Sequence, residues 1–405
     1  MQIEEKYNDF HTTKLVCTNQ NELPSELQAI MKKIAREEGY LNYKMMSRSI
    51  STEGGDYMAS LYEVDIEGKT NEGNKETNIF IKRVISQDHV KILDVSDIYS
   101  KELFFYNDLS KLFTELETEA GVPVEERYKS VKSYNESDTE SIIMQNLNKE
   151  GFTTLYRMNV MPLKFAELSI QQLARFHALS FVIQQKRPEY FERKIKILKH
   201  PINYGEDYVE FCKNMYKVSS IHLSSEIKAK IDRKADEYMK NYITGHKTDV
   251  SCLCHGDFRV NNILLKMTEG EITDIIPVDY QLMHYGSPIL DFLFFIFGAT
   301  DKEFRRKHLN HLKDMYHETM EQYLKYFDID VNMIYPKKKF QMDCEDNLEY
   351  GLEFYLYIGP IMFTLEDDVP DFDKVDLREV KVKLDNRYYE RLQGIVDDMI
   401  VGGKL

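Results

Sequence analysis

The sequence predicts an α+β fold in two lobes, a small strand-rich lobe followed by a large helical one. Two observations lead to this prediction. Strand patterns are concentrated in residues 1–147, and helical patterns dominate residues 148–405. Because the texture changes at this point, we expect the boundary between the two lobes there.

The composition indicates which classes of binding partner and which cellular compartment to expect for this protein. The formal net charge of −15 disfavours nucleic acid, whose binding depends on Lys and Arg neutralising phosphates. The N-terminus shows no secretory signal, and the strongest apolar run, residues 289–299, is too short to cross a membrane. The five cysteines are odd in number and irregular in spacing, which favours free thiols over a disulfide framework or a zinc site. We therefore expect a cytoplasmic protein with no membrane span and no obligate protein partner.

The N-terminal part divides into alternating elements. Apolar residues at helical spacing, between Pro24 and Gly39, predict the first helix. A Gly-Gly turn signal predicts a hairpin, and a polar stretch after it predicts a loop. Helix, hairpin, loop, strand, helix and a pair of strands are expected in this order at residues 23–38, 49–68, 69–78, 79–85, 98–113 and 128–146.

The C-terminal part is mainly helical. Its one interruption is a pair of short strands that flank a loop, at residues 252–266 and 272–278. Helices are expected at residues 165–185, 205–243 and 289–299 and over most of the remainder.

The decisive stretch is HGDFRVNNILL, residues 255–265, followed by IIPVDYQ, residues 275–281. Phosphoryl transfer needs a carboxylate to orient the acceptor hydroxyl and accept its proton, and hard oxygen ligands to hold magnesium. Asp257 supplies the base in this interpretation. Asn262, five positions on, and Asp279, at the end of a nearby strand, supply the metal ligands.

This loop resembles the phosphotransferase loop H-G-D-x-x-x-x-N of aminoglycoside and choline kinases. More closely, the chain resembles the ecdysteroid kinase-like family, choline-kinase-like kinases abundant in insects. The resemblance is carried by HGDFRVNNILL, VDYQ and YGSPILDFLFF, and more weakly by LARFHALS and KELFFYNDL, so that it covers residues 45–365. It implies the two-lobed protein-kinase-like fold, with ATP and Mg²⁺ as cofactors.

The resemblance also implies roles in the N-terminal lobe. Lys82, within a strand pattern, is expected to contact the α- and β-phosphates and to pair with Glu102 on the following helix. The nucleotide-covering loop is expected around Gly54 and Gly55, whose backbone amides reach phosphate easily. The sequence here departs from G-x-G-x-x-G, and a simple hairpin turn is an open alternative.

Further residues are expected to bind adenine or to support the loop. Asp291, a carboxylate in an apolar run, must be paired and is interpreted as tying the catalytic loop. His255 is either a support for that loop or simply a satisfied core histidine, and His177 is expected in the core. Residues 350–363, rich in aromatic rings, either wall the acceptor pocket or belong to the core. The hinge that meets adenine is expected at Met144, Gln145, Asn146 and Leu147.

The predicted activity is that of an ATP:alcohol phosphotransferase. The resemblance implies a bulky lipophilic alcohol, above all an ecdysteroid that is inactivated or stored by phosphorylation. Three alternatives stay open: a detoxifying kinase for xenobiotic hydroxy compounds, a choline- or aminoglycoside-type kinase with a cationic acceptor, and a non-catalytic steroid-binding pseudokinase. A protein kinase is disfavoured, because the sequence has neither a DFG nor an APE motif.

Overall fold

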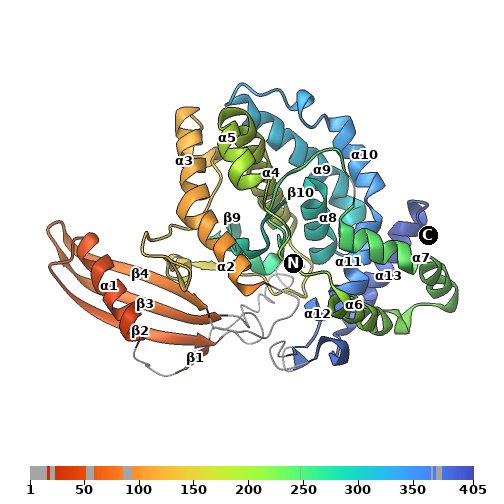
Figure 1. The fold of residues 1–405 in the computed structure, drawn as a ribbon, viewed down its shortest axis with the longest axis horizontal. Helices are drawn as coiled ribbons and strands as arrows, with labels where there is room; N and C mark the ends of the chain where they lie inside the picture. Colours follow the sequence, from red (N-terminus) through yellow and green to blue (C-terminus); the bar gives the residue numbers. More distant parts are fainter. Residues whose placement is uncertain are drawn as a thin grey trace.

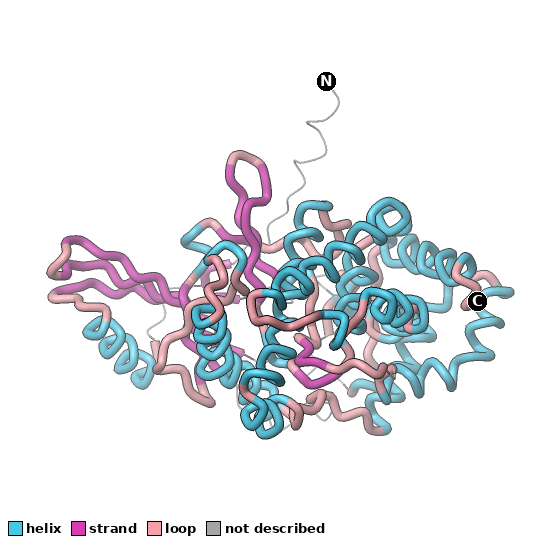
Figure 2. Tube along the Cα trace, turned by 90° about the horizontal axis from the view of Figure 1, so that it is seen from above, coloured by secondary structure: helices cyan, strands magenta, loops and turns pink. Residues whose placement is uncertain are grey.

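The computed structural model describes residues 16–18, 23–51, 59–84, 94–246, 248–365, 368–370 and 376–405. Gly54 and Gly55 lie outside these residues. A strand-rich lobe stands at one end of the molecule and a mainly helical lobe forms the rest (Figures 1 and 2), which confirms the predicted α+β two-lobed architecture.

The N-terminal lobe is built on a five-stranded antiparallel sheet in which the strands follow one another in chain order. The strands are β1 (Val16–Thr18), β2 (Asn42–Ser51), β3 (Ala59–Thr70), β4 (Gly73–Val84) and β5 (Ser141–Gln145). Helix α1 (Ser25–Glu37), close to its predicted bounds, packs Leu27, Met31 and Ile34 against one face of this sheet.

Alternation along the strands sorts the side chains between the two faces of the sheet. On β4, Ile79 and Ile81 face α1 and are fully buried. Lys82, the next residue, therefore points to the opposite face, which is the face turned towards the rest of the molecule. Its neighbours in register there are Leu61 on β3 and Ile142 on β5.

Two local predictions for this lobe are wrong. The polar stretch 69–78 is not a loop, because β3 and β4 pair as far as Thr70 and Gly73 and leave a two-residue turn. Strands that reach into solvent on both faces need no apolar alternation, so composition hid them. The segment 128–146 holds one strand, β5, and its first half contributes only an isolated bridge from Ser133 to Met144.

The helix that carries Glu102 is interrupted. It runs as α2 (Val95–Phe104), a π-helical turn (Phe105–Leu109) and α3 (Ser110–Glu119). The side chain of Asp94 caps its start by accepting a hydrogen bond from the Asp97 backbone amide at 3.0 Å.

Helices form most of the C-terminal lobe (Figures 1 and 2). The long helix α4, predicted at residues 165–185, lies against α9 and the apolar helix α8. Among the described residues, no helix is long and apolar enough to cross a bilayer. The helices are α4 (Leu163–Lys186), α5 (Pro188–Tyr190), α6 (Glu206–Ser219), α7 (Ser225–Thr244), α8 (Pro288–Ala299), α9 (Lys302–Lys325), α10 (Lys337–Asp346), α11 (Glu349–Tyr357), α12 (Gly359–Met362) and α13 (Asn386–Val401).

Two small sheets contain the segments on either side of the predicted catalytic and metal-binding residues. One pairs β7 (Cys252–Cys254) with β10 (His284–Gly286), and the other is ordered β6 (Phe152–Thr153), β8 (Ile263–Thr268) and β9 (Glu271–Pro277). Both pairings are antiparallel, so the loops between β7 and β8 and after β9 emerge side by side.

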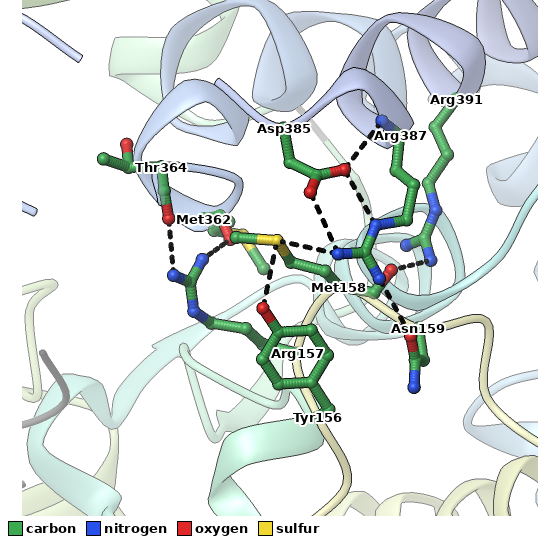
Figure 3. A network of polar contacts seen from close by, with 9 residues as sticks. All are labelled: Tyr156, Arg157, Met158, Asn159, Met362, Thr364, Asp385, Arg387 and Arg391. Atoms are coloured by element: carbon green, nitrogen blue, oxygen red, sulfur yellow. Dashed lines mark hydrogen bonds and ion pairs between the residues drawn. The ribbon is translucent and has the colours of Figure 1, made fainter. Parts of the chain in front are cut away.

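The C-terminal helix is fastened to the segment that precedes α4 by a polar network (Figure 3). Arg391 on α13 is buried. It donates to the Met158 carbonyl at 2.8 Å and to the Gly298 carbonyl at 3.4 Å, and its guanidinium lies over the Phe363 ring at 5.0 Å. The ion pair of Arg387 with Asp385 lies beside it.

We predict that Arg391→Ala lowers the free energy of unfolding by about 2–4 kcal/mol, because it removes packing and leaves the buried Met158 carbonyl without its donor. Urea unfolding measures the change. The matched control is Arg378→Ala, since Arg378 is exposed and its pair with Asp376 is solvated, so the urea midpoint should stay unchanged there. Equal losses in the two variants would contradict this interpretation of the network.

Candidate active site

The pairing of β8 with β9 brings the two expected metal ligands together. Ile263 lies opposite Pro277 in this ladder, so Asn262 and Asp279 stand at the same end of the strand pair. The Val278 amide donates to the Asn262 carbonyl at 2.9 Å and closes that end. Asp279 itself adopts a left-handed conformation, with φ of 70°, which is uncommon for a residue with a side chain and is typical of functional loops.

Asp257 faces the same place from the loop after β7. The Asn262 side-chain amide donates to its carboxylate at 2.8 Å and to its carbonyl at 3.0 Å, and Arg259 Nε donates to the carboxylate at 3.1 Å. Because Nδ2 of Asn262 is committed in this way, Oδ1 is the atom of that side chain suited to a metal ion.

The Asp257 carboxylate is deeply set but still reachable, since 17% of the side chain stays exposed. Burial raises its pKa, the guanidinium of Arg259 opposes the rise, and the nearby charge of Asp279 adds to it. A carboxylate with a raised pKa is a better proton acceptor than an ordinary aspartate, which suits a general base.

Lys82 connects the two lobes at this site. Its Nζ lies 3.1 Å from Glu102 Oε2 on α2 and 3.5 Å from Asp279 Oδ1. Lys82 and Glu102 are almost fully buried, whereas 28% of the Asp279 side chain remains exposed. The three charges thus stand in a chain that ends at the open carboxylate of Asp279.

An aromatic stack holds the helix with Glu102 against the loop with Asp279. Phe105 lies three residues after Glu102, and its ring is stacked on the Tyr280 ring, with centroids 3.3 Å apart and planes at 12°. Tyr280 directly follows Asp279, and its hydroxyl shares a hydrogen bond of 2.7 Å with the Tyr128 hydroxyl. The ion chain and the stack therefore fix the same two elements side by side.

Asp291, in the first turn of α8, holds the loop between β7 and β8 by hydrogen bonds to its backbone. Its carboxylate accepts from the backbone amides of His255 at 2.6 Å and Gly256 at 3.0 Å. Gly256 has φ of 81°, and a Cβ there would come within 2.2 Å of the Leu282 carbonyl oxygen. Only glycine fits this position, so the loop passes close under the segment that follows Asp279.

Two histidines complete this support. His177 donates from Nε2 to Asp291 at 3.2 Å and accepts at Nδ1 from the Tyr316 hydroxyl at 2.6 Å, so it is a satisfied core histidine. His255 is buried among the rings of Phe176, Phe258 and Tyr280, and burial lowers its pKa. The ring therefore packs in its neutral form between the loop and these aromatic side chains, and its role as a support for the loop stays a prediction.

The expected hinge, Met144 to Leu147, covers the end of β5 and the start of the 3-10 turn that follows it. The amide of Gln145 donates to the Lys132 carbonyl and that of Asn146 to the Asn78 carbonyl, both at 2.9 Å. Both amides are therefore used in hydrogen bonds within the N-terminal lobe. The contact with adenine that we predict would have to be made by the other backbone groups of residues 144–147.

A group of potential soft metal ligands lies behind the loop. One ligand atom each of His177, Cys252 and Cys254 falls within 4.8 Å of the others. Both ring nitrogens of His177 already have partners, and burial raises the pKa of both thiols. A metal ion would have to displace Tyr316 or Asp291, so we interpret the group as packing.

Sequence reasoning missed Arg259, although its place two residues after Asp257 in the loop was a usable signal. It also missed Lys101, a buried lysine beside Glu102 that is paired with Asp97 at 2.7 Å. The contact of Phe105 with Tyr280 could not be found from the sequence, because the two residues lie far apart in the chain and only the fold brings them together.

We predict that Asp291→Asn loosens the catalytic loop, because the amide oxygen can replace only one of the two carboxylate acceptors. Hydrogen exchange of the His255 and Gly256 amides should become about tenfold faster or more. Asp301→Asn is the matched control: Asp301 caps α9 through the Phe304 amide at 2.7 Å, and asparagine caps equally well. Unchanged exchange in Asp291→Asn would show that the two hydrogen bonds do not hold the loop.

Comparison with known proteins gives the family. Solved structures that overlap the chain include the ethanolamine kinase Pv091845 of Plasmodium vivax (12% identity, TM-score 0.38, 92% of this chain and 89% of that one). They also include a microcompartment-associated aminopropanol kinase (12%, 0.44, 93% and 99%) and a choline/ethanolamine kinase family protein from Mesorhizobium loti (11%, 0.37, 94% and 98%). Because these TM-scores are below 0.5, the similarity supports no conclusion about this chain. No curated protein matches it significantly.

The sequence profile of the ecdysteroid kinase-like family, by contrast, matches residues 53–329, which is more than half of the chain and includes the whole site described above. The protein is thus a small-molecule phosphotransferase, and the chain belongs to the ecdysteroid kinase-like family.

Proposed function

We propose that the protein transfers the γ-phosphoryl group of ATP to a hydroxyl of a lipophilic alcohol, and that this alcohol is an ecdysteroid. The observation that supports the reaction best is the convergence of Asp257, Asn262 and Asp279 at one end of the β8–β9 pair, with Lys82 reaching Asp279 from the other lobe. The ecdysteroid is supported by family membership.

In this proposal, Asp257 orients the acceptor hydroxyl and takes its proton at the exposed carboxylate oxygen. Arg259 and Asn262 hold that carboxylate in one orientation, so little reorganisation is needed when the hydroxyl arrives. Asp291 keeps the loop in place from behind.

Nucleotide binding is assigned to the N-lobe face. Lys82, oriented by Glu102, is placed to neutralise phosphate oxygens. Asn262 Oδ1 and the Asp279 carboxylate are a set of hard oxygen donors, which fits Mg²⁺. Bound there, Mg²⁺ supplies positive charge that stabilises the phosphates during transfer. The lobes would divide at residues 147 and 148, and residues 144–147 would face adenine.

The test of the reaction is ATP consumption by the purified protein against ecdysone, a xenobiotic phenol and choline, with products identified by mass spectrometry. We expect a phosphorylated ecdysteroid, and at least about a 10²-fold loss of kcat in Asp257→Asn, because the base is removed while the fold is kept. Asp274→Asn, a change of the same kind on β9 where the carboxylate pairs with Lys129, should leave kcat unchanged.

Three other outcomes would overturn parts of the proposal. Turnover of the phenol alone would make the protein a detoxifying kinase, and turnover of choline alone would make it a cationic-alcohol kinase. Nucleotide binding without turnover of any compound would make it a pseudokinase.

The metal assignment predicts a distinct effect. Removal of Mg²⁺ by EDTA should abolish turnover, and Mg²⁺ should restore it. Asp279→Asn should raise the Mg²⁺ concentration needed for half-maximal rate by about tenfold or more, since a charged ligand becomes neutral. Titration of Mg²⁺ at saturating ATP measures this, again with Asp274→Asn as control. An unchanged Mg²⁺ requirement would remove Asp279 from the ligand set.

A further inference from the structure

Two buried carboxylates lie on the same face of the N-terminal sheet as Lys82. On β3, Leu61 lies opposite Lys82 in the ladder, and Glu63 and Asp65 follow it at two-residue steps, so all four side chains share that face. Only 5% of Glu63 and 4% of Asp65 is exposed. Two neighbouring carboxylates away from water are costly unless cations and hydrogen-bond donors compensate them.

Three side chains compensate these carboxylates. Arg48 on β2 donates from Nε to Glu63, and from Nη1 to Asp65 at 3.3 Å. Lys149 donates to Asp65 Oδ2 at 3.0 Å, and Asn146 donates from Nδ2 to Glu63 Oε1 at 2.8 Å. We call Arg48, Glu63, Asp65, Asn146 and Lys149 the β3 clamp. The β3 clamp joins the sheet to the segment that directly follows β5.

Asn146 is held at both ends of its side-chain amide. Its Nδ2 donates to Glu63, its Oδ1 accepts from the Asn148 backbone amide at 3.1 Å, and only 2% of the residue is exposed. Oδ1 thereby caps the short 3-10 turn Leu147–Glu150. Because this side chain is fixed at both ends, the backbone on either side of Asn146 is fixed with it.

The segment that Asn146 holds offers two backbone groups to a ligand. The Gln145 carbonyl and the Leu147 amide have no hydrogen-bond partner among the described residues, and they are an acceptor and a donor two residues apart. Adenine presents an amino donor and ring-nitrogen acceptors, which are the complementary groups. The β3 clamp therefore holds the part of the backbone that is left for the predicted contact with adenine.

We propose that Glu63 and Asn146 are positioning residues for nucleotide binding, which act through the backbone of residues 145–147. In this proposal the β3 clamp sets the affinity for the base, whereas Lys82 and the predicted metal ligands set the affinity for the phosphates. The inference rests on the proposed function for the place of adenine. It adds a part of the site that lies outside the phosphate-binding and catalytic residues.

The hydrogen bond between Asn146 and Glu63 can be broken and then rebuilt in the opposite direction. Asn146→Asp keeps an oxygen for the Asn148 amide but places a second carboxylate against Glu63. Glu63→Gln keeps an oxygen for only one of its two partners, Asn146 and Arg48. In the double variant, the amide nitrogen at position 63 can donate to the carboxylate at position 146, and the amide oxygen remains for Arg48.

We expect each single variant to weaken ATP binding by about tenfold, and the double variant to recover to within about threefold of the wild type. Binding of inorganic triphosphate, which has the phosphates but no base, should not change in any of the three. Calorimetry in the presence of Mg²⁺ measures both ligands. A general loss of structure would weaken both ligands alike, so the difference between them reports on the base alone.

The matched control is Asn347→Asp at the end of α10 in the C-terminal lobe. Asn347 is equally buried, with 4% exposed, and its side chain donates to the Asp343 carbonyl at 2.8 Å. This change also breaks a buried hydrogen bond and adds a carboxylate. It should therefore lower the urea midpoint, while the affinity for ATP stays that of the wild type.

Three results would overturn the proposal: equal weakening of ATP and inorganic triphosphate, unchanged ATP affinity in both single variants, or a double variant no better than the single ones. Failure of the wild type to bind ATP would overturn it together with the proposed reaction. The expected binding pattern without turnover of any alcohol would support the β3 clamp and contradict only the proposed reaction. Turnover with unchanged ATP affinity in the variants would contradict only the β3 clamp.

Discussion

The arrangement of the whole site depends on the ammonium of Lys82, placed between Glu102 and Asp279. Three charges taken out of water are costly unless they compensate one another, so each fixes the position of the next. Lys82 belongs to the sheet, Glu102 to the helix packed beside it, and Asp279 to the loop of the other lobe. The orientation of the lobes at the site is thereby linked to the pairing of Lys82 with two carboxylates, of which Asp279 keeps exposed surface.

The contacts that support these charged groups are either apolar or made to backbone amides inside the protein. The Phe105–Tyr280 stack joins helix to loop without any charge, and Asp291 uses its carboxylate on backbone amides inside the protein. The groups that carry the proposed chemistry are therefore held by groups that substrate does not reach.

The sequence predicted the two-lobed fold and the residues that lie close together in the chain. Asp257 and Asn262 share one loop, and Asp279 follows a single hairpin later, so local spacing was enough to group them. The extension of the β3–β4 hairpin was missed, because strands solvated on both faces lack an apolar pattern. Gly54 and Gly55 remain predictions.

The π-helical turn at Phe105–Leu109 has a consequence for how this region tolerates insertions and deletions. A π-helical turn holds one residue more than the α-helical path would need. The extra residue lets α2 and α3, on either side of it, each keep its own packing face. Deleting one residue within Phe105–Leu109 would return that turn to the α-helical path, whereas deleting one residue from the α-helical part on either side would rotate the two halves against each other by about 100°. Glu102 and Phe105 would then no longer face Lys82 and Tyr280 while α3 kept its place. Length is thus more constrained than composition in this helix, and single-residue indels should be far rarer in it than substitutions.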